Sequence, residues 1–599
     1  YNIIIKKGAN METTLTVLDK VNNPEDLRKL SIEEMNKLSA EMRELISKKV
    51  NTIGGHLGPN LGFVEATIAL HYVFNSPVDK FVFDVSHQCY PHKILTGRKE
   101  GYTDADKYLK YTGYTAPEES AHDLFKVGHT STSVSLATGL AKGRDLRGGK
   151  ENIVAIIGDG SLSGGEAFEG LDNAAVLGSN IIVIVNDNEM SIAKNEGGLY
   201  ANLKLLRDTN GEAECNFFKA LGFEYHYLDN GHDIKAMIDL FSKVKDANHP
   251  VLIHLHTIKG KGLEIAELDK ESYHWILPGA LDKKDDLKSV KKVEDYGSIT
   301  AKYIEGKLAQ DNTVIAISPA TPAVSGFSPV FRDKVGIHYT DVGIAEEHAI
   351  AFSSGIAKNG GKPILGIMSS FIQRTYDQLS QDLALNSNPA TILVFWGAIT
   401  GMDATHLTIF DIPVVSNIPN MVYLAPTCRE EYLKMLDWSV EQNEHPVAIR
   451  VPFGEVISTG VEDMTDYSIL NKYQVVEEGS EVAILGLGNF FHLGKKVQKE
   501  LSEKLGIKAT LINPKFITGV DEELMENLKS NHKVVITLED GVLDGGFGEK
   551  IARYFGNSDM KVLNFGAKKE FTDRASVEEL YVRYHLTPEL IVEDIKACL

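Results

Sequence analysis

Residues 153–193 place the strongest constraint on the fold, because two short apolar runs flank a helix-like stretch. The runs at residues 153–157 and 181–185 read IVAII and IIVIV, which is typical of strands buried on both faces. The stretch from about residue 165 to 177 has a helical pattern, so the segment predicts a strand, a helix and a second, parallel strand. Such a unit belongs to an open sheet that is covered by helices.

A polar cluster closes each of the two predicted strands: GDG at residues 158–160 and NDN at residues 186–188. Ligands of open parallel sheets bind outside the carboxyl ends of the strands. Glycine N–H groups can approach a diphosphate, and Asp and Asn oxygens suit a hard cation such as Mg²⁺. We therefore expect Asp159 and Asn188 to share one metal ion. For either cluster alone, an ordinary turn is an equally good interpretation.

Composition limits the classes of protein that remain. The chain has 599 residues, which predicts three or four domains, and its 43% hydrophobic and 24% charged residues are those of a soluble globular protein. The net charge of −21 argues against a general nucleic-acid surface, and no apolar run approaches the ~18 residues that cross a bilayer. The four cysteines have no CxxC spacing, so we expect a cytoplasmic protein without a zinc site or a disulfide framework. Residues 1–10 precede Met11, and we interpret them as a leader outside the fold.

Glycine- and histidine-rich motifs precede the central segment. GHTSTS, from Gly128, comes before a helix of small residues whose first N–H groups could bind a phosphate. A histidine beside glycines, such as His56 in GGHLGPNLG, is by itself more often a loop residue than a functional one. Strand-like and helix-like segments alternate along the whole chain, which predicts parallel, doubly wound sheets.

In order and spacing, the motifs of this chain resemble those of the 1-deoxy-D-xylulose-5-phosphate synthase family. They are GGHLGPNLG, DVSHQCYPHKILTGR, GHTSTS, GDGSLSGGEAFEGL, NDNEMSI, DVGIAEEHAIAFSSGIA and SSFIQRTYDQLSQDLAL. The resemblance covers nearly all of residues 11–599. It implies a thiamine-diphosphate-dependent transferase of isoprenoid precursor synthesis that uses Mg²⁺, joins a 2-oxo acid donor to an aldehyde acceptor, and forms a homodimer.

The resemblance also implies an α/β fold with three doubly wound, mostly parallel-sheet domains of the transketolase type. The first domain, residues 1–290, would bind the diphosphate and Mg²⁺. The second, residues 291–465, would bind the pyrimidine, and residues 466–599 would form the C-terminal transketolase-like domain. In the synthases the first two domains around one cofactor belong to the same chain, whereas in transketolase they come from opposite subunits. The sequence leaves this arrangement open.

Carried over position by position, the resemblance assigns Mg²⁺ to the side chains of Asp159 and Asn188 and to the carbonyl of Met190. Asn188 also belongs to the cofactor site. The catalytic positions are Glu346, His56, Asp403 and His406, of which Glu346 also binds the cofactor. The other cofactor-binding positions are His87, Gly128, His129, Thr130, Gly160, Ser161, Leu263, His274 and Phe371.

Glu346, in GIAEEH, matches the glutamate that binds N1′ of the aminopyrimidine and promotes loss of the proton from C2. Partial burial would raise the pKa of its carboxyl group enough to share a proton with the ring. Glu347 stands where the family usually has glutamine, and this second carboxylate could perturb the first. Without the family context, a glutamate in the first turn of a helix is more simply a partner of the helix dipole.

Four positions depart from the family pattern, and each loses a polar group. Trp396 replaces an arginine seven residues before Asp403, and Phe453 replaces the later arginine of an Arg-Tyr-Pro-Arg-Gly pattern. Met368 and Leu263 replace tyrosines. Guanidinium groups form paired, charge-assisted bonds to phosphate, so the loss of two of them bears on the acceptor.

Three functions remain open on the sequence alone. The first is the family reaction, in which pyruvate and D-glyceraldehyde 3-phosphate give 1-deoxy-D-xylulose 5-phosphate and CO₂. The second is a related carboligase or transketolase-like enzyme with another acceptor, such as an unphosphorylated aldehyde in an aromatic pocket. The third is a non-catalytic regulatory paralogue. The retention of Glu346, Asp159 and Asn188 argues against the third, because a silent copy does not need the metal ligands and the proton-relay group together.

Overall fold

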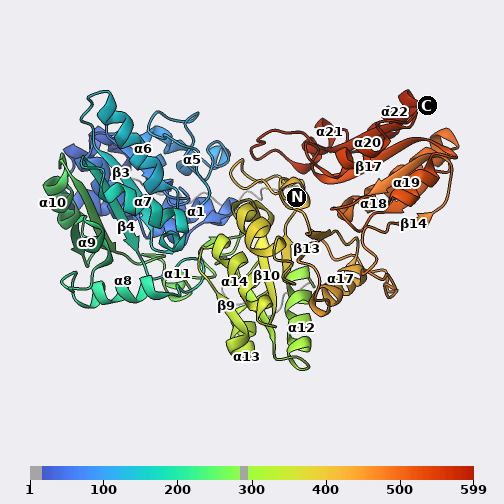
Figure 1. Ribbon diagram of the computed structural model, residues 1–599. Coiled ribbons are helices and arrows are strands. Elements are labelled where there is room, and N and C mark those ends of the chain that lie inside the picture. Colours follow the sequence, from blue (N-terminus) through green and yellow to red (C-terminus); the bar gives the residue numbers. More distant parts are fainter. Residues whose placement is uncertain (1–16, 283–293) are drawn as a thin grey trace. The chain divides into compact units, whose positions relative to one another are not determined.

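The computed structural model describes residues 17–282 and 294–599 (Figure 1). The expectation for residues 1–10 therefore lies outside the described residues. The chain divides into two units, residues 1–289 and residues 290–599. A capping box at Ser31 begins the helix at residues 32–53: the Ser31 Oγ accepts from the N–H of Glu34 at 3.2 Å, and the Glu34 carboxylate accepts from the N–H of Ser31 at 2.9 Å.

A five-stranded, wholly parallel sheet in the order β2-β3-β4-β6-β5 organises the first unit. Its strands are β2 (Lys80–Phe83), β3 (Ile153–Gly158), β4 (Ile181–Asp187), β5 (Glu224–Leu228) and β6 (Pro250–His256), and a separate antiparallel pair is formed by β1 (Gly55–His56) and β7 (Trp275–Ile276). The helices are α1 (Ile32–Ile53), α2 (Gly58–Leu61), α3 (Val64–Val73), α4 (Tyr90–Lys93), α5 (Glu100–Thr103), α6 (Ser133–Leu146), α7 (Gly165–Ala175), α8 (Gly198–Asp208), α9 (Phe217–Leu221), α10 (Ile234–Val244) and α11 (Glu264–Leu268).

Both faces of this sheet are buried, which explains the unbroken apolar runs. Ile153, Ala155 and Ile157 of β3 belong to the cluster that includes residues of α6 and α7 (Figure 1). Val154 and Ile156 point the other way, into the cluster formed with α3 and α10. Successive side chains of a strand face opposite sides, so a strand covered by helices on both sides must be apolar throughout. The predicted strand-helix-strand unit is thus confirmed.

The two central strands run further than their apolar residues. β3 includes Gly158 and β4 includes Asn186 and Asp187, and Gly158 pairs with Asn186 across the two strands. The NDN cluster therefore begins inside the sheet, where strand pairing holds the main chain of its first two residues, and only Asn188 follows the strand end.

The second unit contains two further sheets. One is six-stranded and wholly parallel, in the order β12-β13-β11-β10-β8-β9. Its elements are α12 (Tyr296–Leu308), β8 (Val314–Ser318), α13 (Pro329–Val335), β9 (Tyr339–Asp341), α14 (Glu346–Lys358), β10 (Lys362–Met368), α15 (Ser369–Ile372), β11 (Thr391–Phe395), α16 (Asp411–Ser416), β12 (Val422–Leu424), α17 (Arg429–Glu441) and β13 (Val447–Arg450).

The other sheet has the order β14-β16-β15-β17-β18, and in it β14 alone runs antiparallel to its neighbour. Its elements are β14 (Gln474–Glu477), β15 (Glu481–Gly486), α18 (Phe491–Leu505), β16 (Thr510–Asn513), α19 (Glu522–Leu528), β17 (His532–Val542), α20 (Phe547–Phe555), β18 (Lys561–Ala567), α21 (Val577–Arg583) and α22 (Pro588–Cys598). These parallel, helix-covered sheets match the α/β fold class expected from the sequence.

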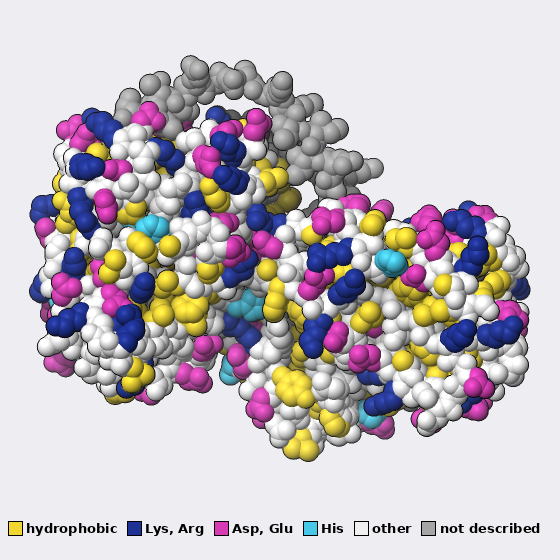
Figure 2. All heavy atoms as spheres, turned by 90° about the horizontal axis from the view of Figure 1, so that it is seen from above, with side chains coloured by type: hydrophobic (Ala, Val, Ile, Leu, Met, Phe, Trp, Pro, Cys, Tyr) yellow, Lys and Arg dark blue, Asp and Glu magenta, His cyan; other side chains and the backbone are white. Residues whose placement is uncertain are grey.

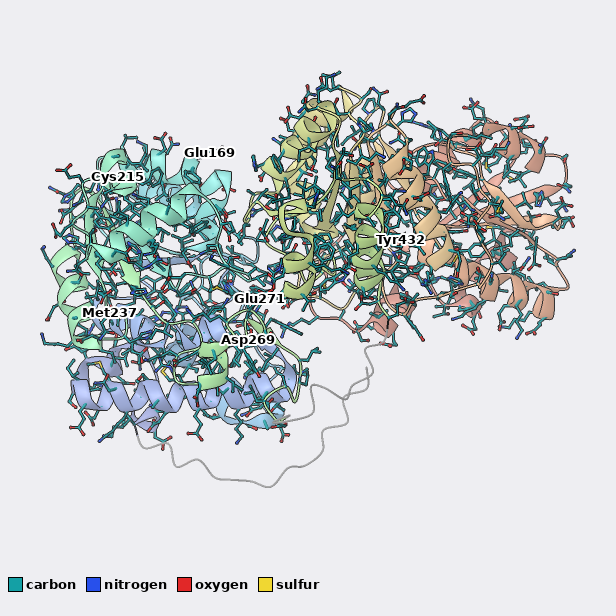
Figure 3. The ribbon with its side chains drawn as sticks, turned by 90° about the horizontal axis from the view of Figure 1, so that it is seen from below. Glu169, Cys215, Met237, Asp269, Glu271 and Tyr432 are labelled. Carbon is teal, nitrogen blue, oxygen red and sulfur yellow. The ribbon has the colours of Figure 1, made fainter. Side chains whose placement is uncertain are left out.

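The two sheets of the second unit share a core. Backbone hydrogen bonds join them directly: Ile517 N–H donates to the Tyr423 carbonyl at 2.7 Å, and Ala425 N–H donates to the Lys515 carbonyl at 2.8 Å. Tyr432 of α17 is fully buried within this core and shares a hydrogen bond of 2.5 Å with the Thr300 hydroxyl of α12 (Figure 3).

On the face drawn in Figure 2, acidic and basic side chains are interspersed, and neither sign is gathered in one field. Among residues 17–282 and 294–599, none of the helices combines the length and the apolar character that a bilayer crossing requires.

Candidate functional site

Asp159 lies at the carboxyl end of β3, directly beside the end of β4. Its main-chain N–H donates to the Asn186 carbonyl at 3.1 Å, and its carboxylate accepts from Asn195 Nδ2 at 2.7 Å. The N–H groups of Gly160 and Asn188 also donate to this carboxylate. Burial, and then the neighbouring Asp187, raise the pKa of Asp159 well above its usual range. A buried carboxylate in this position is stabilised in its charged form by a cation.

Asn188 supplies a second oxygen at the same edge of the sheet. Its side chain is 8% exposed, and its buried Oδ1 accepts no hydrogen bond from any residue of the described chain. Met190 follows two residues later in a loop that the Met190–Lys194 bridge closes. A carboxylate, an orphaned amide oxygen and a nearby main-chain carbonyl are donor types that Mg²⁺ takes, so these residues fit a magnesium ion.

Asp187, which sequence reasoning did not single out, secures the end of β4. Its Oδ2 is 2.8 Å from His254 Nε2, and it pairs with Arg207. Burial raises the pKa of Asp187, but the bonds with His254 and Arg207 outweigh this and hold the pKa below its usual value. Asp187 and Asp159 therefore differ although they are close together: the first is bonded to His254 and Arg207, whereas the second accepts from the neutral N–H groups of Asn195, Gly160 and Asn188.

The loop that carries Gly128, His129 and Thr130 lies against the GDG loop. It leads into α6, and Ser131 ties it down, since its N–H donates to Asp84 Oδ1 at 2.8 Å and its hydroxyl donates to the Ser161 carbonyl at 2.8 Å. Gly160 leaves no room for a side chain, because an added Cβ would lie 2.6 Å from Ser191 Cβ. The glycine loops are thus brought together at one place, as expected for a phosphate cradle.

Three of the four predicted histidines of the first unit form a cluster. The ring centroid of His56 lies 5.1 Å from that of His87 and 5.5 Å from that of His274, and the rings of His87 and His274 are stacked at 5.5 Å. The pairing of β1 with β7 sets this distance, because Leu57 N–H donates to the His274 carbonyl at 3.1 Å. His129 lies in the phosphate loop described above.

The turn before His274 fixes the third histidine. His274 N–H donates to the Glu271 carbonyl at 3.2 Å, and Tyr273 N–H donates to the Asp269 carbonyl at 3.2 Å (Figure 3). Burial, with the neighbouring Lys259 and the other two histidines, lowers the pKa of His274 well below its usual value. The ring is therefore neutral at physiological pH, and its Nδ1 has no hydrogen-bond partner within residues 17–282 and 294–599.

Asn60 holds the histidine loops in place, although sequence reasoning passed over it. Its Nδ2 donates to the carbonyls of His56 at 2.9 Å and His87 at 2.7 Å, and its Oδ1 accepts from the N–H of Tyr90 at 2.9 Å. The side chain is fully buried. Its only signal in the sequence is its place within GGHLGPNLG, because all three bonds reach main-chain atoms.

Asn60→Ala is expected to destabilise the first unit by about 2–4 kcal/mol, since a fully buried side chain loses three hydrogen bonds worth about 1 kcal/mol each. We expect a weaker affinity for thiamine diphosphate as well, because the histidine loops lose their anchor. Urea unfolding and calorimetric titration would measure the two effects. Asn173→Ala, at an exposed position of α7, is the matched control and should change neither; equal effects of the two substitutions would contradict the role of Asn60.

Lys259 and Leu263 follow β6. Lys259 is almost fully buried, its Nζ donates to the Ser191 carbonyl, and burial lowers its pKa to about 7. Its charge would lie close to Asp159 and the GDG loop. Leu263 is the N-cap of α11 and packs, partly buried, against the apolar cluster to which residues of α1 belong.

In the second unit, Glu346 begins α14 and is 2% exposed. Burial raises the pKa of Glu346 to about 7, and Arg374, whose Nη1 lies 3.6 Å from Oε2, opposes this rise. Glu347 adds a further upward effect, as the sequence suggested. The Oε2 atom of Glu346 accepts no hydrogen bond from any of the described residues. The carboxyl group therefore has one oxygen that is held only by a long ion pair, and its pKa lies near neutrality, which fits a partner that exchanges a proton.

Phe371, His406 and Asp403 lie together at the end of the six-stranded sheet. The rings of Phe371 and His406 are 5.9 Å apart, and His406 N–H donates to the Asp403 carbonyl at 2.9 Å. The Ser369 hydroxyl fastens this loop to the sheet through the Thr408 carbonyl at 2.9 Å. Burial lowers the pKa of His406 to about 4, so its ring is neutral at physiological pH.

The positions of the two missing arginines are adjacent in space. Trp396 and Phe453 form an edge-to-face ring pair with centroids 6.4 Å apart. Trp396 has a φ of +65°, which is unusual for a large side chain and is typical of residues at functional sites. Arg450 does not replace them, because it is buried and committed to Asp411, at 2.7 Å, and to Asp540.

Comparison with protein families identifies three regions of this chain. Residues 18–215 and 209–257 match the family model described as 1-deoxy-D-xylulose-5-phosphate synthase. Residues 295–456 match the pyrimidine-binding domain of transketolase, and residues 471–591 match the transketolase C-terminal domain.

Two curated relatives illustrate the similarity over the whole chain. A protein of Clostridium beijerinckii named 1-deoxy-D-xylulose-5-phosphate synthase is 36% identical over 618 residues, covering 96% of this chain and 98% of that protein. A protein of the same name from Carboxydothermus hydrogenoformans is 37% identical over 617 residues, covering 96% and 97%. Among solved structures, a transketolase from Campylobacter jejuni is 17% identical with a TM-score of 0.42, over 95% of this chain and all of that one.

Proposed function

Because the chain belongs to the 1-deoxy-D-xylulose-5-phosphate synthase family, we propose that it joins a two-carbon unit from pyruvate to D-glyceraldehyde 3-phosphate, with release of CO₂. It is a thiamine-diphosphate-dependent transferase that forms a carbon–carbon bond, with relatives of this family aligned over 96% of its length. The observation that carries the proposal is Glu346, a buried carboxyl group with a pKa of about 7 at the start of a helix.

When bound, thiamine diphosphate supplies a carbon nucleophile and an electron sink for the decarboxylation and the ligation. We assign Mg²⁺ to Asp159, Asn188 and the Met190 carbonyl, because the first two present a buried carboxylate and an orphaned amide oxygen at neighbouring strand ends. Main-chain N–H groups of the loops at 128–130 and 160–161 would face the diphosphate. The imidazole of His87 and the neutral imidazole of His274 would border the same cradle.

Glu346 holds a proton near neutrality and can pass it to a ring nitrogen or take it back. Its pKa of about 7 suits this role, because a general acid–base group works best near the operating pH. Phe371 offers an aromatic face in the same unit. His56, and His406 with Asp403, are assigned to the reacting carbonyls as hydrogen-bonding groups. The buried His406 is neutral, so it can donate one proton and accept another.

We propose further that the enzyme works as a homodimer in the cytoplasm. The dimer rests on the family resemblance. The compartment rests on the cysteines: Cys89, Cys215, Cys428 and Cys598 are all free thiols, which suits a reducing environment.

Carbon dioxide release by the purified protein tests the reaction. The assay contains thiamine diphosphate, Mg²⁺ and pyruvate, with or without D-glyceraldehyde 3-phosphate, and the sugar phosphate is followed by mass spectrometry. We expect the phosphorylated aldehyde to stimulate CO₂ release and 1-deoxy-D-xylulose 5-phosphate to accumulate. The opposite outcome is stimulation by unphosphorylated aldehydes alone, which would suit the aromatic pair of Trp396 and Phe453. It would show that the acceptor is not D-glyceraldehyde 3-phosphate, and the proposed reaction of pyruvate would still stand.

A further inference from the structure

A loop of the C-terminal sheet packs against the loop that carries Asp403. The first loop comprises residues 568–576, between β18 and α21, and the second comprises residues 401–406. Asp573 Oδ1 accepts from the N–H of Ala404 at 3.0 Å, and Arg574 N–H donates to the Met402 carbonyl at 3.1 Å. An added Cβ on Gly401 would lie 2.7 Å from the Ala575 carbonyl oxygen. One main-chain bond, one bond from the main chain to the Asp573 carboxylate and this close approach therefore fix the two loops against each other.

Arg574 brings a positive charge to this contact between the two loops. Its Nε lies 3.8 Å from Asp403 Oδ1, and its Nη2 lies 3.4 Å from Asp573 Oδ2. Its φ of +51° turns the chain at this point. The two carboxylates hold the guanidinium beside the loop of Asp403 and His406, and 36% of the side chain remains exposed. A small anion can therefore reach it.

The other arginines of this region are engaged elsewhere. Arg450 is buried between Asp411 and Asp540, and Arg374 is 15% exposed and lies against Glu346. The two places at which the family has phosphate-binding arginines hold the ring pair of Trp396 and Phe453. A cation near Asp403 would stabilise the phosphate group of an acceptor bound there, and Arg574 Nε lies 3.8 Å from Asp403 Oδ1.

We propose that Arg574 binds the phosphate group of the acceptor, and that the 568–576 loop thereby supplies from the C-terminal sheet a specificity residue that replaces the two missing arginines. This inference rests on the proposed function, because it concerns the acceptor of the same reaction. A guanidinium is suited to the task, since its planar N–H groups match two oxygens of a phosphate at once. Asp403 and Asp573 keep it in place between turnovers.

Comparison of phosphorylated and unphosphorylated acceptors tests the proposal. For Arg574→Gln we expect kcat/KM with D-glyceraldehyde 3-phosphate to fall by about 10- to 100-fold, mainly through KM, as for the loss of one charged contact. The values with D-glyceraldehyde and the KM for pyruvate should stay within about twofold of the wild type, because neither carries a phosphate group. Inorganic phosphate should inhibit the wild type in competition with the phosphorylated aldehyde and should inhibit Arg574→Gln much less. Arg574→Lys should recover part of the loss, since it restores the charge without the planar fork.

Arg583→Gln is the matched control, because Arg583 is an exposed arginine of the neighbouring helix that pairs with Glu570. It should leave both acceptors unchanged. An equal loss with both acceptors in Arg574→Gln would make Arg574 a support of the Asp403 loop and overturn the proposal. Unaltered kinetics would overturn it too. A wild-type protein that does not use D-glyceraldehyde 3-phosphate would instead overturn the proposed function, and this inference with it.

Discussion

Glu346→Gln is expected to lower kcat by about 10²- to 10⁴-fold, the usual contribution of a general acid–base group. Glutamine keeps the size of the side chain and the helix start but cannot exchange a proton. Cofactor binding should be largely preserved, as should the fold, because the substitution replaces a buried carboxyl group by a neutral one. Steady-state CO₂ release and calorimetric titration with thiamine diphosphate measure the two properties separately.

Glu347→Gln is the control for this experiment. It removes the neighbouring carboxylate, which raises the pKa of Glu346 only as a secondary cause, and it restores the residue usual in the family. Its kcat should stay within about threefold of the wild type, since Glu346 itself remains. A Glu346→Gln enzyme that turns over at the wild-type rate would remove Glu346 from the mechanism.

The same residue predicts a pH dependence of stability. The pKa of Glu346 rises from 4.5 to about 7 in the folded protein, so the folded state binds more protons than the unfolded state between these values. Stability due to this group is therefore highest below about pH 4.5 and is lost as pH rises through 7, by roughly 3 kcal/mol in all. Glu346→Gln should stabilise the apoprotein at pH 8 and have little effect at pH 4.5. Urea unfolding at the two pH values would show this difference, and a destabilisation at pH 8 would contradict it.

Asp159→Ala is expected to abolish Mg²⁺-dependent binding of thiamine diphosphate, with a loss of affinity of about 100-fold or more, because it removes the charged ligand of the proposed metal site. Asp159→Asn should behave similarly, since an amide is a weaker ligand for Mg²⁺ than a carboxylate. Calorimetric titration with Mg²⁺ present, and again with a chelator, measures the loss.

Stability without metal distinguishes a lost ligand from a damaged fold. The carboxyl group of Asp159 is buried and its pKa is raised, so a neutral side chain there should leave the metal-free protein at least as stable as the wild type. Asp172→Asn, at an exposed position of α7, is the control and should bind the cofactor normally. Unaltered affinity of Asp159→Ala in the presence of Mg²⁺ would refute the metal assignment.

Several features of the site followed from local sequence. The runs IVAII and IIVIV became β3 and β4 because a strand buried on both faces must be apolar at every position. The GDG and NDN clusters then met, because the carboxyl ends of adjacent parallel strands share one edge. The helix start at Ser31 followed from the capping box, whose two hydrogen bonds involve residues only three apart.

Other contacts of the site could be seen only in the tertiary structure. They join residues that are distant in the chain and whose types carry no local signal. His56 meets His274 through the pairing of two-residue strands, and Asn60 works through main-chain atoms that any residue could offer. Arg450 matched the family pattern, yet its buried partners Asp411 and Asp540 lie on other elements. The sequence by itself therefore determined the family and the strands, and it predicted the reacting groups, since these depend on neighbouring residues and on motif spacing. Which cation stands beside Asp403 depended on how two distant loops pack, and only the folded chain decided it.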